Sequence, residues 1–144
     1  MFSKESTGYL FGLGKRKIVM LLGKAVLGIS TLVFIGYGLI SLFSPAIPAG
    51  YAGLSMNNGD AFAEIGAMYG GLQTGIGLFC GIALLKSEYY RSGLVLLVLA
   101  ISALALARLI SLLVAPDSVT AYTYAALGYE SVTAVLALAA LLKK

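Results

Sequence analysis

Four long apolar stretches constrain this chain more than any other feature of its sequence. They cover roughly residues 18–43, 61–85, 92–114 and 125–142. Each exceeds the ~17 residues that an α-helix needs to cross the hydrocarbon core of a bilayer. Prolines mark the gaps, with Pro45 and Pro48 after the first stretch and Pro116 after the third. The sequence therefore predicts an all-α fold, a four-helix transmembrane bundle, with an N-terminal segment at 1–17 and a membrane domain at 18–144.

The composition supports an integral membrane protein and excludes several kinds of site. Hydrophobic residues make up 60% of the chain and charged residues 11%, against roughly 45–50% and 25% in soluble domains. Histidine is absent and Cys80 is the single cysteine, which excludes the usual zinc sites and an internal disulfide. We expect Cys80 to pack between helices as a small apolar residue. The residues indicate no metal site and identify no cofactor.

The basic residues predict the direction in which the chain crosses the membrane. Nine of the ten fall on one side of the four-helix arrangement: Lys4, Lys15, Arg16, Lys17, Lys24, Lys86, Arg91, Lys143 and Lys144. The loops at 44–60 and 115–124 contain no lysine or arginine. Because cytoplasmic segments carry the excess of these residues, both termini and the 1–17 segment are expected in the cytoplasm. The basic residues are scattered along membrane borders, so they do not indicate a nucleic-acid partner.

A cleavable signal peptide is the alternative interpretation of the basic start and the apolar continuation in "KRKIVMLLG". Lys24 interrupts that continuation, and the uncharged run after it, 25–43, covers 19 residues. The apolar region of a signal peptide usually has about 7–15 residues. We therefore expect the first helix to be retained.

Small residues predict where the helices pack. Lipid is as apolar as leucine, so helices in a bilayer associate through close backbone contact rather than through hydrophobicity. The second span is rich in glycine, and we expect helix packing at Gly66, Gly70, Gly71 and Gly75. Two interpretations stay open, packing within one bundle and contact with another chain in a homo-oligomer or a larger membrane complex.

Three charged residues lie well inside the predicted spans, away from the basic end of the first, and they are the main candidates for a functional site. Glu64, Arg108 and Glu130 each lie four to six residues from the outer end of a span, roughly 6–9 Å below the outer surface. An isolated charge at the bilayer centre costs ~3 kcal/mol. We therefore expect Arg108 to hold Glu64, with Glu130 close by. The cluster is either a structural lock between helices or a site for ligand binding or proton exchange.

Neighbouring polar residues extend this candidate site. Ser111 is expected on the helical face of Arg108. Tyr69 and Gln73 lie one turn apart and form a hydrogen-bonding strip that points away from Glu64. Asp60 is placed to cap the second span through its side-chain oxygen.

Two motifs resemble a known family. They are "AEIGAMYGGLQTGIGLF" at 63–79 and "ARLISLL" at 107–113, followed by Glu130 in the last span. Together they resemble the bacterial membrane family of domain of unknown function 4345, within the wider DoxX-like group of four-helix membrane proteins. The resemblance covers 60–142 and implies a multi-pass protein of the bacterial cytoplasmic (inner) membrane. It implies no established activity. Gly66 departs from the family, which often has an arginine at this position.

These observations support three classes of function. The first is a non-catalytic membrane protein, either an accessory subunit or a small-ligand-binding bundle with a Glu/Arg/Glu cluster near its outer face. The second is a small oligomeric transporter or channel that uses the acidic cluster for proton or solute exchange. An enzyme is the least favoured, because the sequence shows no catalytic triad, metal set or phosphate-binding loop. The lipid bilayer is the expected partner in every case.

Overall fold

The described residues form seven α-helices, and short segments of other helix types join some of them. The computed structural model describes the backbone of residues 3–143 and the side chains from Arg16 to Lys143. The helices are α1 (Ser3–Phe43), α2 (Ala46–Ala52), α3 (Gly59–Ile65), α4 (Leu72–Leu85), α5 (Tyr90–Leu96), α6 (Ser102–Val114) and α7 (Ala121–Leu142). π-Helical segments join α3 to α4 (Gly66–Gly71) and α5 to α6 (Leu97–Ile101), and a 3₁₀ turn (Ser87–Tyr89) precedes α5. The described residues contain no strand.

Four continuous helical segments are long and apolar enough to cross a membrane. They are Arg16–Phe43, Gly59–Leu85, Ser87–Val114 and Ala121–Leu142. The shortest has 22 residues, about 33 Å at 1.5 Å per residue, which exceeds the ~30 Å hydrocarbon core. The predicted all-α, four-helix transmembrane fold is confirmed, and the chain is a multi-pass membrane protein.

The predicted boundary at 17/18 falls inside a helix, because α1 runs from Ser3 to Phe43 without a break. The side chains of Lys4 and Lys15, and the whole of Lys144, lie outside the described residues. The direction of the chain across the membrane stays a prediction.

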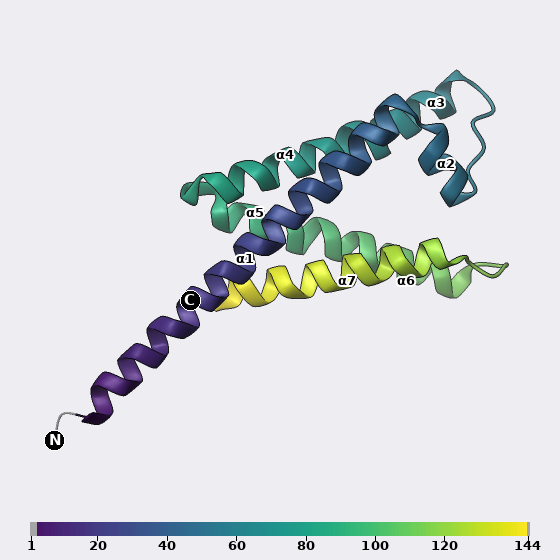
Figure 1. Ribbon diagram of the computed structural model, residues 1–144. Helices are drawn as coiled ribbons and strands as arrows, with labels where there is room; N and C mark the ends of the chain where they lie inside the picture. Colours follow the sequence, from purple (N-terminus) through teal and green to yellow (C-terminus); the bar gives the residue numbers. More distant parts are fainter. Residues whose placement is uncertain (1–2, 144) are drawn as a thin grey trace.

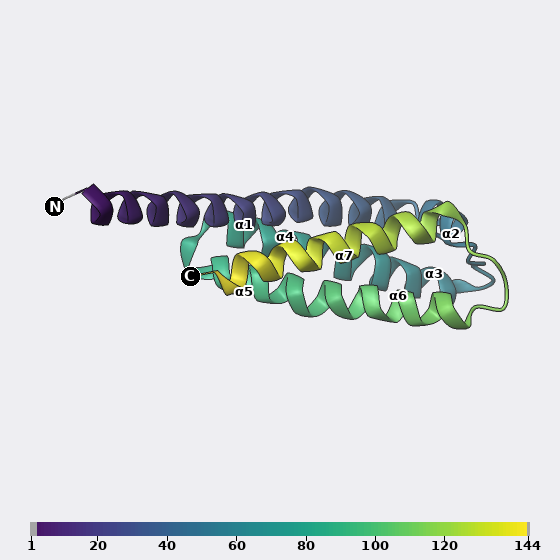
Figure 2. The same ribbon diagram turned by 90° about the horizontal axis from the view of Figure 1, so that it is seen from below.

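The helices are arranged as two pairs that meet at one end and separate at the other. Helix α1 packs most extensively against α4, and α6 packs against α7. Figure 1 shows the two pairs approaching each other near α5 and the C-terminus, and diverging toward α2 and α3. We call these the closed end and the open end. The N-terminal part of α1 extends beyond the closed end alone (Figures 1 and 2).

An apolar core joins the two pairs toward the closed end. Leu27, Cys80, Leu94, Leu97 and Ala137 are completely buried there and belong to one contiguous cluster. These five residues come from α1, α4, α5, the π-helical segment after α5 and α7. Cys80 therefore packs as the sequence predicts.

Glycines allow α1 and the second span to approach closely. A side chain at Gly77 would lie 2.7 Å from the backbone nitrogen of Ile35, and one at Gly70 would lie 3.0 Å from Leu42. Gly38 on α1 faces Gly70 and Thr74 in the same way. Gly70 and Gly77 are seven residues apart, so they lie on one face of the helix.

Three of the glycines predicted to pack do not make this contact. Gly66 and Gly75 have open space where a side chain would project, and Gly71 meets only a carbonyl of its own helix, 4.0 Å away. Gly71 and Gly75 each lie about 100° or more round the helix from the stripe of Gly70 and Gly77. The expectation of packing at Gly66, Gly71 and Gly75 is therefore corrected to a stripe through Gly70 and Gly77.

The second span begins with a different cap from the one expected. Asn58 is the N-cap residue, and its side-chain oxygen accepts a hydrogen bond of 2.9 Å from the backbone N–H of Ala61. Asp60 lies in the first turn instead, where a negative charge still suits the positive end of the helix dipole. Before it, the loop at 44–60 contains α2, whose Pro48 and Ala49 are buried.

Candidate functional site

A cavity of about 340 Å³ lies between the two helix pairs in the half of the molecule toward the open end. All four spans contribute to its lining. The lining residues are Val33, Phe34 and Tyr37 from the first span, Tyr69 and Gln73 from the second, Leu104 and Arg108 from the third, and Tyr122, Ala125, Ala126, Tyr129 and Glu130 from the fourth.

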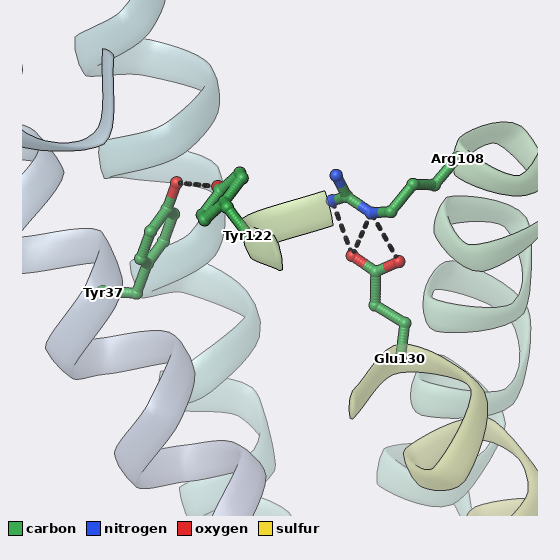
Figure 3. A network of polar contacts seen from close by, with 4 residues as sticks. All are labelled: Tyr37, Arg108, Tyr122 and Glu130. Carbon is green, nitrogen blue, oxygen red and sulfur yellow. Dashed lines mark hydrogen bonds and ion pairs between the residues drawn. The ribbon is translucent and has the colours of Figure 1, made fainter. Parts of the chain in front are cut away.

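An ion pair between α6 and α7 forms the charged part of the cavity wall. Arg108 Nη2 lies 2.7 Å from Glu130 Oε1, and Arg108 Nε donates to both carboxylate oxygens at 2.9 and 3.1 Å (Figure 3). The Glu130 side chain is 6% exposed and the Arg108 side chain 25%. The carboxylate is therefore buried, and the guanidinium, which reaches the cavity, compensates its charge.

Aromatic side chains form much of the remaining wall. The hydroxyls of Tyr37 and Tyr122 lie 3.3 Å apart, and either can donate (Figure 3). Tyr37 also packs edge-to-face against Tyr69, with ring centroids 6.5 Å apart. Phe34 and Tyr129 make a second edge-to-face pair at 6.3 Å. These geometries are the favoured ones for aromatic pairs, so the rings hold one another in place around the cavity.

π-Helical segments lie next to the cavity residues of the second and third spans. Gly66–Gly71 contains Tyr69 and ends two residues before Gln73. Leu97–Ile101 ends three residues before Leu104. Each π-helical turn changes the rotation of the residues after it and often occurs at functional sites. Here these turns set which side chains of α4 and α6 face the space between the pairs.

Several polar atoms of the cavity wall have capacity for a further hydrogen bond. Gln73 Oε1 and the Tyr129 hydroxyl are buried without a hydrogen-bond partner among the described residues. Arg108 Nη1 makes no hydrogen bond to any described residue, and Figure 3 shows this nitrogen clear of the carboxylate. Buried polar groups are normally paired. Gln73 Oε1 and the Tyr129 hydroxyl have almost no accessible surface, so the Arg108 guanidinium, whose side chain is 25% exposed, is the group best placed to meet a bound molecule.

Four of the six predicted site residues come together, and two do not. Tyr69, Gln73, Arg108 and Glu130 line the same cavity. Ser111 is exposed on the surface of α6 and does not line it.

The expected pairing of Glu64 with Arg108 is wrong, because Arg108 pairs with Glu130. Glu64 is exposed and lines an adjoining cavity of about 520 Å³ with Met68 and Leu72. Met68 and Leu72 follow Glu64 by one and two turns and are 48% and 51% exposed. Glu64 thus belongs to the outward face of its span, while Tyr69 and Gln73 lie on the face toward the cavity.

Sequence reasoning missed the aromatic wall, because Phe34, Tyr37 and Tyr129 were not singled out. A signal was present on the fourth span, where Tyr122, Ala126, Tyr129 and Glu130 recur at helical spacing and share one face. A tyrosine next to a buried glutamate on such a face indicates a polar, aromatic surface turned inward.

Within the described residues, no group of three or more histidine, cysteine, aspartate and glutamate side chains could hold a metal ion. Comparisons with curated proteins and with solved structures found no match. A family model matches residues 22–141, which include the second and third spans, most of the first and fourth, and every residue that lines the 340 Å³ cavity. The chain therefore belongs to the family described as Domain of unknown function (DUF4345).

Proposed function

We propose that the protein is a membrane receptor or accessory subunit that binds a small, uncharged, amphipathic molecule in the cavity between its two helix pairs. The observation that carries this proposal is the chemistry of the cavity wall. Five aromatic side chains and several aliphatic ones surround a single ion pair whose two charges compensate each other. Such a wall combines apolar surface with a few convergent polar groups, which is typical of small-molecule sites.

The size and lining of the cavity favour a ligand with an apolar or aromatic body. A volume of about 340 Å³ falls within the ~300–1,000 Å³ that small-molecule pockets occupy. Phe34, Tyr37, Tyr69, Tyr122 and Tyr129 present ring faces and edges to this space, and aromatic rings pack well against other flat or apolar groups.

The charge of the site favours a neutral ligand. Glu130 already compensates Arg108, so a charged ligand would lose its hydration without gaining an unpaired counter-charge, which is costly in a poorly hydrated place. A carbonyl or hydroxyl oxygen could accept from Arg108 Nη1.

The adjoining cavity favours a second candidate, movement of a small solute between the two helix pairs. Tyr69, Gln73 and Leu104 line both cavities, and Glu64 lines the outer of the two. The two cavities therefore adjoin at Tyr69, Gln73 and Leu104, with Glu64 on one and the Arg108–Glu130 pair on the other. A transporter or channel of this kind would assemble as an oligomer, because four helices are few for a carrier.

Filling the cavity tests the binding proposal. Ala126 lines the cavity, so leucine in Ala126→Leu would occupy ligand space, and filling a cavity tends to stabilise a fold by ~0.5–2 kcal/mol. Ala103→Leu adds the same volume on the exposed surface of α6 and serves as the matched control. Native mass spectrometry of the purified proteins should find a small molecule retained by wild type and by Ala103→Leu, and lost from Ala126→Leu. Retention by Ala126→Leu at the wild-type level would contradict the proposal.

A further inference from the structure

A second, smaller site lies at the closed end, at the opposite end of the bundle from the aromatic cavity. A groove of about 180 Å³ is formed there by α1, α5 and α7. Three basic side chains line it, Arg16 from α1, Arg91 from α5 and Lys143 directly after α7. Its apolar lining includes Met20 and Leu94. No carboxylate is among the lining residues.

The groove has a fixed wall, which distinguishes it from a loose collection of surface lysines. Tyr90 packs over Gly23, where any side chain on α1 would collide with its ring and hydroxyl. The Tyr90 hydroxyl also donates to the backbone carbonyl of Met20 at 3.4 Å. Gly23 therefore lets α5 approach α1 closely, and this approach holds Arg91 and Arg16 on the same groove.

Among the described side chains, the three positive charges have no carboxylate partner of the kind that Arg108 has. The salt bridge found among the described side chains is that of Arg108 with Glu130, so none involves Arg16, Arg91 or Lys143. All three side chains are exposed. Like charges around so small a groove repel one another, and an anion inside it would interact favourably with all three.

We propose that this groove binds the phosphate-bearing headgroup of an anionic phospholipid. Basic pockets between transmembrane helices bind such headgroups. The position of the groove at a membrane-bordering end of the bundle favours a lipid over a free anion, and so does its partly apolar lining. Nearby apolar side chains are exposed along the same helices, including Ile18 at 69%, Leu21 at 68% and Leu142 at 71%, and they offer surface for acyl chains.

This inference is independent of the proposed small-molecule cavity. The two sites share no lining residue. One has a compensated charge and an aromatic wall, and the other has uncompensated positive charge at the opposite end. Loss of either site would leave the other in place.

Two charge-matched triple variants test the proposal. The groove variant combines Arg16→Gln, Arg91→Gln and Lys143→Gln. The control combines Lys17→Gln, Lys24→Gln and Lys86→Gln, which are exposed basic residues outside the groove. Each changes the formal net charge from +4 to +1 (4 − 3 = 1) and removes three basic residues from the same predicted side. The full-length proteins are mixed in a neutral detergent with dioleoyl phosphatidylglycerol or dioleoyl phosphatidylcholine, and bound lipid is counted by native mass spectrometry.

Wild type should retain phosphatidylglycerol in preference to phosphatidylcholine. The groove variant should lose this preference by roughly tenfold or more, since each basic side chain near an anionic lipid contributes roughly fivefold. The control triple should retain it, and so should Arg16→Lys combined with Arg91→Lys, which keeps the charge. Equal losses in the two triples would attribute the binding to diffuse positive charge and overturn the proposal. Displacement of phosphatidylglycerol by an equal concentration of inorganic phosphate would also overturn it, by assigning the groove to a free anion.

Discussion

The two ends of the bundle join the same four helices by different physical means. Toward the closed end, Leu27, Cys80, Leu94, Leu97 and Ala137 have no exposed surface, and the contacts are apolar. Toward the open end, the pairs separate around a cavity of about 340 Å³. There the Arg108–Glu130 ion pair joins α6 to α7 within one pair, and the Tyr37–Tyr122 contact joins α1 to α7 across the two pairs.

On the proposed function, the difference assigns binding to the open end and close apolar packing to the closed end. A bilayer offers no hydrophobic force between helices, so close packing of small residues must stabilise the closed end. A close-packed interior has no room for a ligand. The open end gives up that packing, and polar and aromatic side chains maintain its geometry. Changes in the closed-end core should therefore alter stability and leave the cavity wall in place, whereas changes in the cavity wall should alter binding and, at the ion pair, stability as well.

The largest expected effect comes from breaking the ion pair at the open end. Arg108→Ala leaves the 6%-exposed Glu130 side chain without its partner, and breaking a buried pair typically costs ~3–5 kcal/mol. The double variant Arg108→Ala/Glu130→Ala removes both charges and should be more stable than Arg108→Ala alone. Unfolding by sodium dodecyl sulfate in mixed micelles would measure the free energy of unfolding of each variant.

Glu64 provides the control for this double-mutant cycle. Because it is exposed and does not pair with Arg108, Glu64→Ala and Arg108→Ala should have additive effects on the free energy of unfolding. Coupling of Arg108 to Glu64 instead of Glu130 would mean that the sequence-based pairing is right and the structural assignment wrong.

Smaller effects on the free energy of unfolding are expected at two glycines of α4, and the effects at the two positions should have opposite signs. Gly77→Ala would place a methyl group 2.7 Å from the backbone nitrogen of Ile35, so α1 and α4 must separate, at a cost of ~1–3 kcal/mol. Gly75→Ala meets no described atom within 4 Å and should stabilise the helix by up to ~1 kcal/mol. Thermal unfolding of the two variants would compare them, and a Gly77→Ala protein as stable as Gly75→Ala would contradict close packing at this point.

The fold could be predicted from the sequence because it depends on the average hydrophobicity of long stretches of the chain and not on individual contacts. Four apolar stretches, each longer than a bilayer is thick, leave little choice other than four helices. Counting residues along straight helices also placed Arg108 and Glu130 at one level, and the structure brings these two side chains together. Both residues line the cavity, as expected because charged residues within a membrane span usually face the interior of the bundle or a cavity.

The partner of Arg108 could not be predicted, because pairing depends on the rotation and separation of helices. Glu64 and Glu130 are both within a few residues of the required depth, and depth alone does not distinguish them. The structure separates them by rotation, since Glu64 shares its face with the exposed Met68 and Leu72. No pattern within a single span indicates that the two helix pairs diverge. The cavity that this divergence creates therefore could not be predicted from the sequence either.

The proposed function requires that the cavity at the open end binds neutral ligands in preference to charged ones. Two fluorescent dyes with the same anilinonaphthalene frame test it most directly, since N-phenyl-1-naphthylamine is uncharged and 8-anilinonaphthalene-1-sulfonate carries a sulfonate. Each is titrated into the purified protein in detergent, with Ala126→Leu supplying the background signal. Wild type should bind the neutral dye saturably and at least roughly tenfold more tightly than the anionic one, because burying an uncompensated charge costs more than the ~1.4 kcal/mol that a tenfold ratio requires. Glu130→Gln, which frees the charge of Arg108, should narrow or reverse that ratio. Equal affinity of wild type for the two dyes, or unchanged binding of the neutral dye by Ala126→Leu, would contradict the claim.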